Sequence, residues 1–180
     1  MALSATIFHL LITVSDVDRN VYETLDLRVA RHPSESMRYM LTRTLAYCLQ
    51  YQEGIVFSKG LSTNDEPPIM VRDLQGTAKV WIDVGNPSAE RLHKARKAVD
   101  SVVVYTQHDP SLLQREAASR PIHKIETIEV FALKGSFLDA LEAATDRTSK
   151  WELVHTDGQL YVTIGGKVIE GTVTRHSLVA

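Results

Sequence analysis

At 180 residues the chain is long enough to bury the core of one domain, and its formal net charge of -2 gives no overall attraction to nucleic acid. Hydrophobic residues make up 44% and charged residues 23%, which excludes a disordered chain. The one cysteine, Cys48, cannot form an internal disulfide, so we expect a reducing compartment, the cytoplasm. We find no secretion signal and no apolar run near the roughly 20 residues that span a bilayer, and we expect no membrane association.

The N-terminal part predicts a hairpin, a helix and two short strands. Residues 3–14 and 21–30 are rich in apolar residues, and the polar turn at 16–20 between them predicts a long β-hairpin. A helix is expected to open at 32–34 and to end near Gly54, because apolar side chains recur there at the three-four spacing of a helix. Short strands are expected at 55–57 and 69–71.

The stretch from Lys79 to Pro87 predicts a central strand that leads directly into a helix. Side chains alternate between apolar and other types from 80 to 85, the period-two pattern of a strand with two different faces. Asn86 and Pro87 have the form of an N-cap and a first-turn proline. Asp83 is therefore expected at the carboxyl end of a strand, where ligands bind in open α/β sheets.

The rest of the chain predicts a βαβ unit, a second helical pair and a meander. The apolar run 102–105 is typical of a strand covered on both faces, and it follows the predicted basic helix. Asp109 and Pro110 are expected to open a helix that ends at 118, a strand is expected at 125–133, and Ser136 with Asp139 has the form of a capping box. Three strand segments separated by two hairpin turns then predict an antiparallel β-meander: 151–155, 160–164 and 168–173. We expect the meander and the N-terminal hairpin to share one sheet system within a single α/β (α+β) domain, 1–180.

Several motifs occur in an order that resembles a known family. They are Arg31-His32-Pro33-Ser34-Glu35, Gly60-Leu61, Asp65-Glu66-Pro67, Trp81-Ile82-Asp83-Val84-Gly85, and Arg91 through Lys94-Ala95. This pattern resembles the YaeQ family over essentially the whole chain, and more loosely the PD-(D/E)XK nuclease superfamily. The resemblance implies a restriction-endonuclease-like mixed sheet core at about 34–106, flanked by helices, with the N-terminal hairpin and the C-terminal meander added to it.

The superfamily resemblance implies a metal-dependent phosphodiester hydrolase, a nuclease acting on DNA or RNA. Glu66 and Asp83 are then the candidate ligands of Mg²⁺ or Mn²⁺, with Asp65 as the alternate, and Glu35 assists through water. Mg²⁺ takes about six oxygen ligands, of which one or two are commonly carboxylates, and it lowers the pKa of a bound water. Lys94 completes the catalytic set, either by stabilising negative charge in the transition state or by positioning the attacking water.

Gly85 departs from the superfamily pattern, which has a lysine two residues after the strand carboxylate. The chain resembles members in which the lysine has moved to the following helix, so either Lys94 or Arg91 takes its place. At 1.5 Å per residue, Arg91 lies about 6 Å and Lys94 about 10 Å along the helix axis from Pro87. Lys94 must therefore reach back, and Gly85 is expected to leave space for the helix side chain.

Each acidic candidate has a structural alternative. Asp83 has the alternative of a buried aspartate that caps a neighbouring backbone group or pairs with an arginine, because such structural networks also perturb carboxylates. Turn formation before Pro67 is the alternative for Asp65 and Glu66. Glu35 has the alternative of a solvated acid in the first turn of its helix, stabilised by the helix dipole.

The basic helix is the candidate nucleic-acid-binding element, and a solvated helix face is its alternative. The residues expected to contact phosphates are Arg91, Lys94 and Lys97. The rival to the enzyme is a catalytically lapsed nuclease-fold module that binds nucleic acid or a protein partner in transcription or repair; a purely structural acidic and basic network is a third interpretation. His32 and His93 show no metal-ligand spacing, and the sequence leaves substrate and oligomeric state open.

Overall fold

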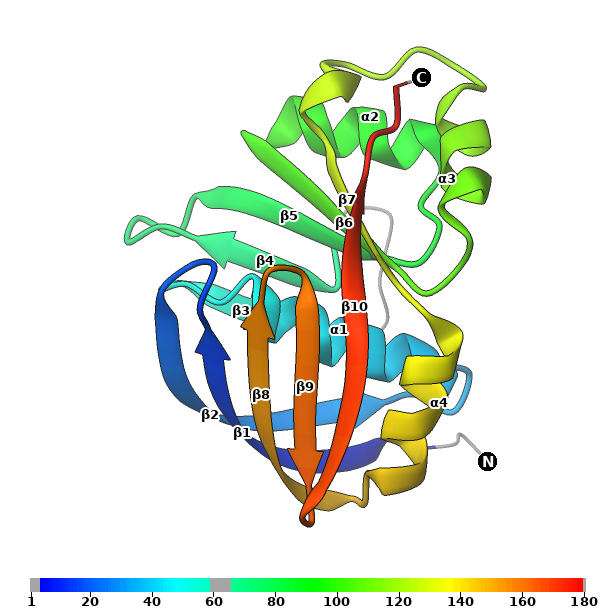
Figure 1. Ribbon diagram of the computed structural model, residues 1–180. Coiled ribbons are helices and arrows are strands. Elements are labelled where there is room, and N and C mark those ends of the chain that lie inside the picture. The colour runs from blue at the N-terminus through cyan, green and yellow to red at the C-terminus, as the bar shows by residue number, and fades with distance from the viewer. Residues whose placement is uncertain (1–3, 59–65, 180) are drawn as a thin grey trace. The chain divides into compact units, whose positions relative to one another are not determined.

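The computed structural model describes residues 4–58 and 66–179 (Figure 1). The elements in chain order are β1 (Thr6–Asp16), β2 (Val21–Arg31), α1 (Met37–Leu49), β3 (Ile55–Phe57), β4 (Ile69–Arg72), β5 (Ala78–Val84), α2 (Ala89–Ala98), β6 (Ser101–Thr106), α3 (Pro110–Ala117), the 3-10 helix η1 (Ile125–Thr127), β7 (Glu129–Leu133), α4 (Gly135–Ala144), β8 (Thr148–Thr156), β9 (Gln159–Ile164) and β10 (Lys167–His176). None of the helices in these ranges is long and apolar enough to cross a membrane.

The chain divides into two compact units, each made of separate stretches of sequence. The first comprises Met1–Leu49 and Leu133–Val173, and the second comprises Gln50–Ala132 and Thr174–Ala180. The mixed α/β class that the sequence predicts is confirmed by strands and helices in both units. That 1–180 folds as one domain stays a prediction.

The first unit contains the predicted hairpin and the predicted meander. β1 pairs antiparallel with β2, and on its other side it pairs in parallel with β8, which continues antiparallel into β9 and β10. Every second side chain of β1 from Leu10 to Val14 is buried. The turn at Asp157 and Gly158 has positive φ at both residues, 50° and 75°, as a type I′ turn requires. The expected sharing of one sheet system by hairpin and meander is confirmed.

The first-unit helices begin and end at residues other than those expected. Ser36 accepts a hydrogen bond from the Tyr39 backbone N–H, and α1 begins at Met37 rather than at 32–34 and ends at Leu49 rather than near Gly54. At α4 the N-cap is Lys134, without a side-chain cap, so the capping box is wrong. Asp139 instead accepts two hydrogen bonds, 2.8 and 2.7 Å, from the guanidinium of Arg38.

The second unit is built on a mixed sheet in which β5 lies between other strands, as predicted. The strand order is β7-β6-β5-β4-β3, with β5, β6 and β7 parallel and β4 and β3 antiparallel. Residues 102–105 of β6 are buried, which confirms a strand covered on both faces. The parallel pairs are joined by α2 and α3 (Figure 1), so the predicted βαβ unit is present.

The core beside α2 explains why this helix has one apolar stripe. Leu92 and Ala95 of α2 are fully buried in one cluster with Val102 and Val104 of β6 and Leu113 of α3. Ala89 is buried in the same cluster, and the charged residues of α2 lie at positions outside this stripe.

In this unit the predicted first residues of α2 and β7 are wrong, and that of α3 is confirmed. Ser88, not Asn86, caps α2 by accepting the Arg91 backbone N–H, so the helix starts at Ala89. Asp109 caps α3 with Pro110 at its first position, as predicted. The expected strand at 125–133 is shorter, because Lys124 has a left-handed backbone and Ile125–Thr127 forms η1.

Candidate functional site

Asp83 near the carboxyl end of β5 is bound by two side chains through three hydrogen bonds. Its residue exposure is 3%. Oδ2 accepts from Nε1 of Trp81 at 2.9 Å and from Nε of Arg91 at 2.8 Å, and Oδ1 accepts from Nη2 of Arg91 at 3.1 Å. Of the two interpretations that the sequence leaves open, the structure has the buried aspartate paired with an arginine.

Arg91 makes this pairing because it lies in the first turn of α2. Its guanidinium binds Asp83 as a two-pronged fork and lies over the ring of Trp81, 5.2 Å from the ring centroid. The positive end of the helix dipole disfavours a cation in a first turn, so the carboxylate supplies a compensating interaction. The Arg91 side chain is 13% exposed and that of Asp83 is 4% exposed, so the pair is shielded from solvent.

Gly85 is required by the backbone at the end of β5. Its φ is +93°, in the left-handed region that favours glycine, and its N–H donates to the carbonyl of Tyr105 at 2.9 Å. A lysine at position 85, where the superfamily has one, would therefore strain the backbone whatever the space around its side chain. That Gly85 also leaves room for a helix side chain stays a prediction.

Glu66 is connected to Asp83 through Arg91. Nη2 of Arg91, which binds Oδ1 of Asp83, also donates to the backbone carbonyl of Glu66 at 2.9 Å. The Glu66 main chain and the Asp83 carboxylate thus converge on one guanidinium nitrogen. The convergence of the two carboxyl groups in one cleft stays a prediction.

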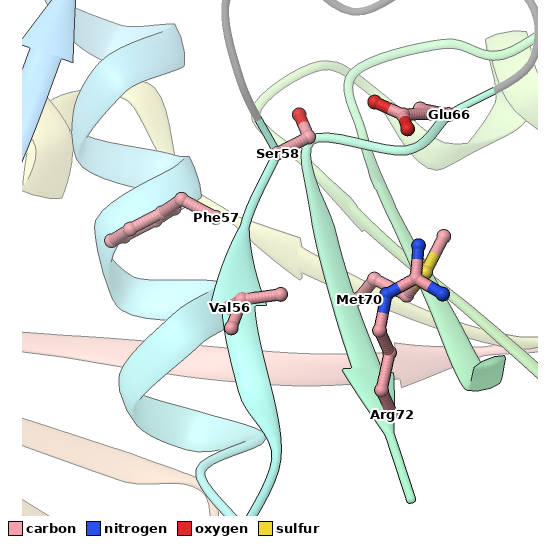
Figure 2. Close-up of a pocket in the computed structure, with 6 residues that line it drawn as sticks. All are labelled: Val56, Phe57, Ser58, Glu66, Met70 and Arg72. Atoms are coloured by element: carbon pink, nitrogen blue, oxygen red, sulfur yellow. The ribbon is translucent and has the colours of Figure 1, made fainter. Parts of the chain in front are cut away.

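The side chain of Glu66 is exposed and lines a pocket beside β3 and β4. The pocket has a volume of about 520 Å³ and is lined by Val56, Phe57, Ser58, Glu66, Met70 and Arg72. Figure 2 shows Met70 and Arg72 on β4, Val56 and Phe57 on β3, and the Glu66 carboxyl in the segment that leads into β4. Asp83 is not among the described residues of this lining.

Lys94 and Lys97 lie farther along α2 and are both exposed. Nζ of Lys94 lies 3.4 Å from Oε1 of Glu90, one turn earlier, and Glu90 also pairs with Arg120 at 3.6 Å. The helix residue that reaches Asp83 is the alternate, Arg91, and not Lys94.

Glu35 belongs to the first unit and has its own arginine. Its Oε2 accepts from Nη2 of Arg43 at 3.2 Å, and its Oε1 accepts from the His32 backbone N–H at 3.3 Å. The side chain of Glu35 is 12% exposed and precedes α1. The interpretation of Glu35 as a solvated acid in the first helical turn is therefore wrong.

Basic residues from the C-terminal half of α2 and from the turn before η1 lie close together. We call this group the basic cluster: His93, Arg96, Lys97, His123 and Lys124. The His123 backbone N–H donates to Nδ1 of His93 at 2.9 Å, and desolvation together with the charges of the other four lowers the pKa of His123. His123 and Lys124 follow a turn between elements, and no helical or strand spacing marks them in the sequence.

The described residues do not fit the expected Mg²⁺ site. Within 4–58 and 66–179 there is no group of three or more acidic, histidine or cysteine side chains placed to hold a metal. The Arg91 guanidinium binds both oxygens of Asp83, so a Mg²⁺ ion bound by this carboxylate has to displace the arginine or lie beside its positive charge. Asp65 and the motif Gly60-Leu61 lie outside the described residues.

Comparison with known proteins gives a consistent result. A family model described as YaeQ protein matches residues 1–173. Two similar proteins are each described as uncharacterized protein YaeQ. That of Escherichia coli strain K12 is 29% identical over 176 residues, covering 97% of each chain, and that of Salmonella typhi is 30% identical over 164 residues, covering 90% of each chain.

Two solved structures agree with the sequence matches. The crystal structure of YaeQ protein from Pseudomonas syringae has a TM-score of 0.86 and 27% identity over 96% of each chain. The YaeQ protein from Xanthomonas axonopodis pv. citri has a TM-score of 0.86 and 27% identity over 97% of this chain and 99% of its own.

Proposed function

The chain belongs to the YaeQ family, and we propose that it is a nucleic-acid-binding module on a PD-(D/E)XK nuclease-like core that does not cleave phosphodiesters. It acts in the cytoplasm, in keeping with its single cysteine, Cys48, which is buried and whose thiol pKa burial raises to about 12. The observation that carries the proposal is the buried pair of Asp83 and Arg91.

The pair of Asp83 and Arg91 supports a structural role for the carboxylate of β5. To bind a metal, Asp83 must give up both prongs of Arg91 and the Trp81 N–H, and the arginine is then left partly buried beside a divalent cation. Both changes cost free energy, since separating a partly buried guanidinium from the carboxylate that it binds with two hydrogen bonds is unfavourable. The nuclease-like core therefore keeps its carboxylate as a fixed part of the fold.

The distribution of charge supports nucleic acid as the ligand. The whole chain carries a formal net charge of -2, so the positive charge on α2 and in the basic cluster is a local feature. Phosphate backbones are bound mainly by local arrays of lysine and arginine, independent of base sequence. DNA and RNA share this chemistry.

The experiment measures binding and cleavage together. Purified protein is mixed with labelled single- and double-stranded DNA and RNA in Mn²⁺, in Mg²⁺ and in chelator at matched ionic strength. We expect salt-dependent binding that is the same with metal and with chelator, and intact oligonucleotides in every sample. Metal-dependent cleavage would overturn the proposal in favour of the rival, a nuclease in which Glu66 and Asp83 bind Mg²⁺ or Mn²⁺.

Two variants assign any cleavage to this protein. Glu66→Gln removes the carboxylate charge but keeps the backbone carbonyl that Arg91 binds, so it tests a metal-binding role without breaking the ion pair. Asp83→Asn tests the same role but also weakens the pair, so its unfolding must be measured alongside. Cleavage that survives in both variants comes from a contaminant or from another site.

A further inference from the structure

The basic cluster is held together by hydrogen bonds between α2 and the segment before η1. The His123 backbone N–H donates to Nδ1 of His93 at 2.9 Å. His93 is half-buried, whereas His123 is exposed. This hydrogen bond fixes the position of the 123–124 backbone relative to the helix.

A second connection runs through Thr127. Nε of Arg96 donates to Oγ1 of Thr127 at 2.8 Å, and the Thr127 hydroxyl donates to the carbonyl of Lys124 at 2.7 Å. Arg96 also donates through Nη1 to the carbonyl of Val99 just beyond α2. Arg96 is thus a positioning residue that holds Lys124, while the side chains of Lys97, His123 and Lys124 are exposed.

Lys124 has an unusual backbone conformation. Its φ of 46° and ψ of 45° lie in the left-handed region, which a residue with a long side chain seldom adopts. Backbone strain of this kind persists only where surrounding contacts enforce it, and it is common at ligand-binding positions. Here the Thr127 hydroxyl and backbone N–H both donate to the Lys124 carbonyl.

The charge around His123 is positive from two sides. Desolvation is the largest cause that lowers the pKa of His123, followed by the charges of Lys124, Arg96, His93 and Lys97. A bound anion relieves this repulsion. By contrast, Arg91 binds Asp83, and Lys94 and Arg120 both pair with Glu90.

We infer that Lys97, His123 and Lys124, positioned by His93 and Arg96, form the phosphate-binding surface for nucleic acid. This inference rests on the proposed function and moves its contact surface away from Arg91 and Lys94, toward the C-terminal end of α2. The surface binds backbone phosphates rather than bases, because its exposed groups are point charges and an imidazole.

The test compares two pairs of lysines by fluorescence anisotropy with a labelled DNA duplex and a labelled RNA strand. Lys97→Gln with Lys124→Gln is expected to weaken binding by about tenfold and to reduce the slope of log affinity against log salt by about two. The matched control is Lys150→Gln with Lys167→Gln, two exposed lysines of the first unit, which should leave affinity unchanged. Thermal unfolding confirms that both double variants are folded.

A pH series gives a second readout. The pKa of His123 is lowered in the free protein, and a bound phosphate raises it, so binding takes up a proton when the pH lies between the two values. Affinity is therefore expected to rise several-fold as the pH falls from about 8 to about 6, and His123→Gln should remove most of this rise.

The outcomes separate this inference from the proposed function. Two results together support both the inference and the proposed function. The wild type binds nucleic acid and the Lys97 and Lys124 double variant binds it more weakly, and the pH dependence of binding is lost in His123→Gln. Binding that the Lys97 and Lys124 double variant keeps in full overturns the assigned surface and leaves the proposed function standing. Absence of binding to any nucleic acid by the wild type overturns both.

Discussion

Glu35 in the first unit and Asp83 in the second are each bound by an arginine eight residues later in the chain. In both cases the acid precedes a helix and the arginine lies on that helix. The two acids were predicted to serve one catalytic site. In this chain, each of the two acids is therefore paired with a cation supplied by the helix that follows it.

The two pairs differ in how completely the acid is bound. Asp83 receives both prongs of Arg91 and the indole N–H of Trp81, whereas Glu35 receives one N–H from Arg43 at 3.2 Å and one backbone N–H. Arg43 also has the Ala30 carbonyl as a partner. Asp83 and Arg91 therefore depend on each other more than Glu35 and Arg43 do. Removing Asp83 should lower the free energy of unfolding more than removing Glu35.

The largest effect is expected from Asp83→Ala. It leaves the guanidinium of Arg91 partly buried without its carboxylate, which should reduce the free energy of unfolding by about 3–5 kcal/mol. Urea denaturation followed by circular dichroism measures the loss. The double variant Asp83→Ala with Arg91→Met should recover part of it, because the partly buried guanidinium is removed together with the carboxylate that it binds. A loss below about 1 kcal/mol would contradict the structural role.

Glu35→Ala should have a smaller effect, about 2 kcal/mol in the same urea experiment. Arg43 keeps its hydrogen bond to the Ala30 carbonyl, so only part of its interaction is lost. If this variant were as destabilising as Asp83→Ala, the claim that Asp83 contributes more to stability than Glu35 would be wrong.

Trp81→Phe isolates the third donor to Asp83. It keeps an aromatic ring beneath Arg91 and removes the Nε1 donor, so a loss of about 1 kcal/mol is expected. Thermal unfolding measures the effect, with Trp151→Phe in the first unit as the control for general loss of core packing. Full stability would show that the indole hydrogen bond adds nothing to the pair.

Lys94→Gln should have the smallest effect, within about 0.5 kcal/mol, because its pair with Glu90 is exposed on both sides. The same urea titration is sufficient. A destabilisation near that of Trp81→Phe would mean that Lys94 contributes to the Asp83 network after all.

The regular elements of both units were largely predictable from local pattern. The hairpin turn at Asp157-Gly158, the cap at Asp109 and the buried strand β6 each follow from residue preferences that act within a few positions. The caps at Ser36 and Ser88 were missed because several capping residues stand in a row, and packing of the helix decides which one is used.

Lys94 was chosen over Arg91 because of the resemblance to the family pattern, although Arg91 lies nearer to the start of the helix. With the helix starting at Ala89, Arg91 lies about 3 Å along the axis from the first residue and Lys94 about 7.5 Å. Arg91 is therefore the nearer of the two to the strand end, as it also is with the expected start at Pro87, and it is the residue that binds Asp83. The contact between Asp83 and Arg91 depends on the angle between β5 and α2, which no local pattern specifies.

The most direct test of the account is a Mn²⁺ titration of the wild type and of Glu66→Gln, with free Mn²⁺ followed by electron paramagnetic resonance. The account predicts that Asp83 stays paired with Arg91 and that the two proteins leave the same amount of free Mn²⁺ at every concentration. A Mn²⁺ site in the wild type that Glu66→Gln abolishes would show that Glu66 holds a metal, and would contradict the account.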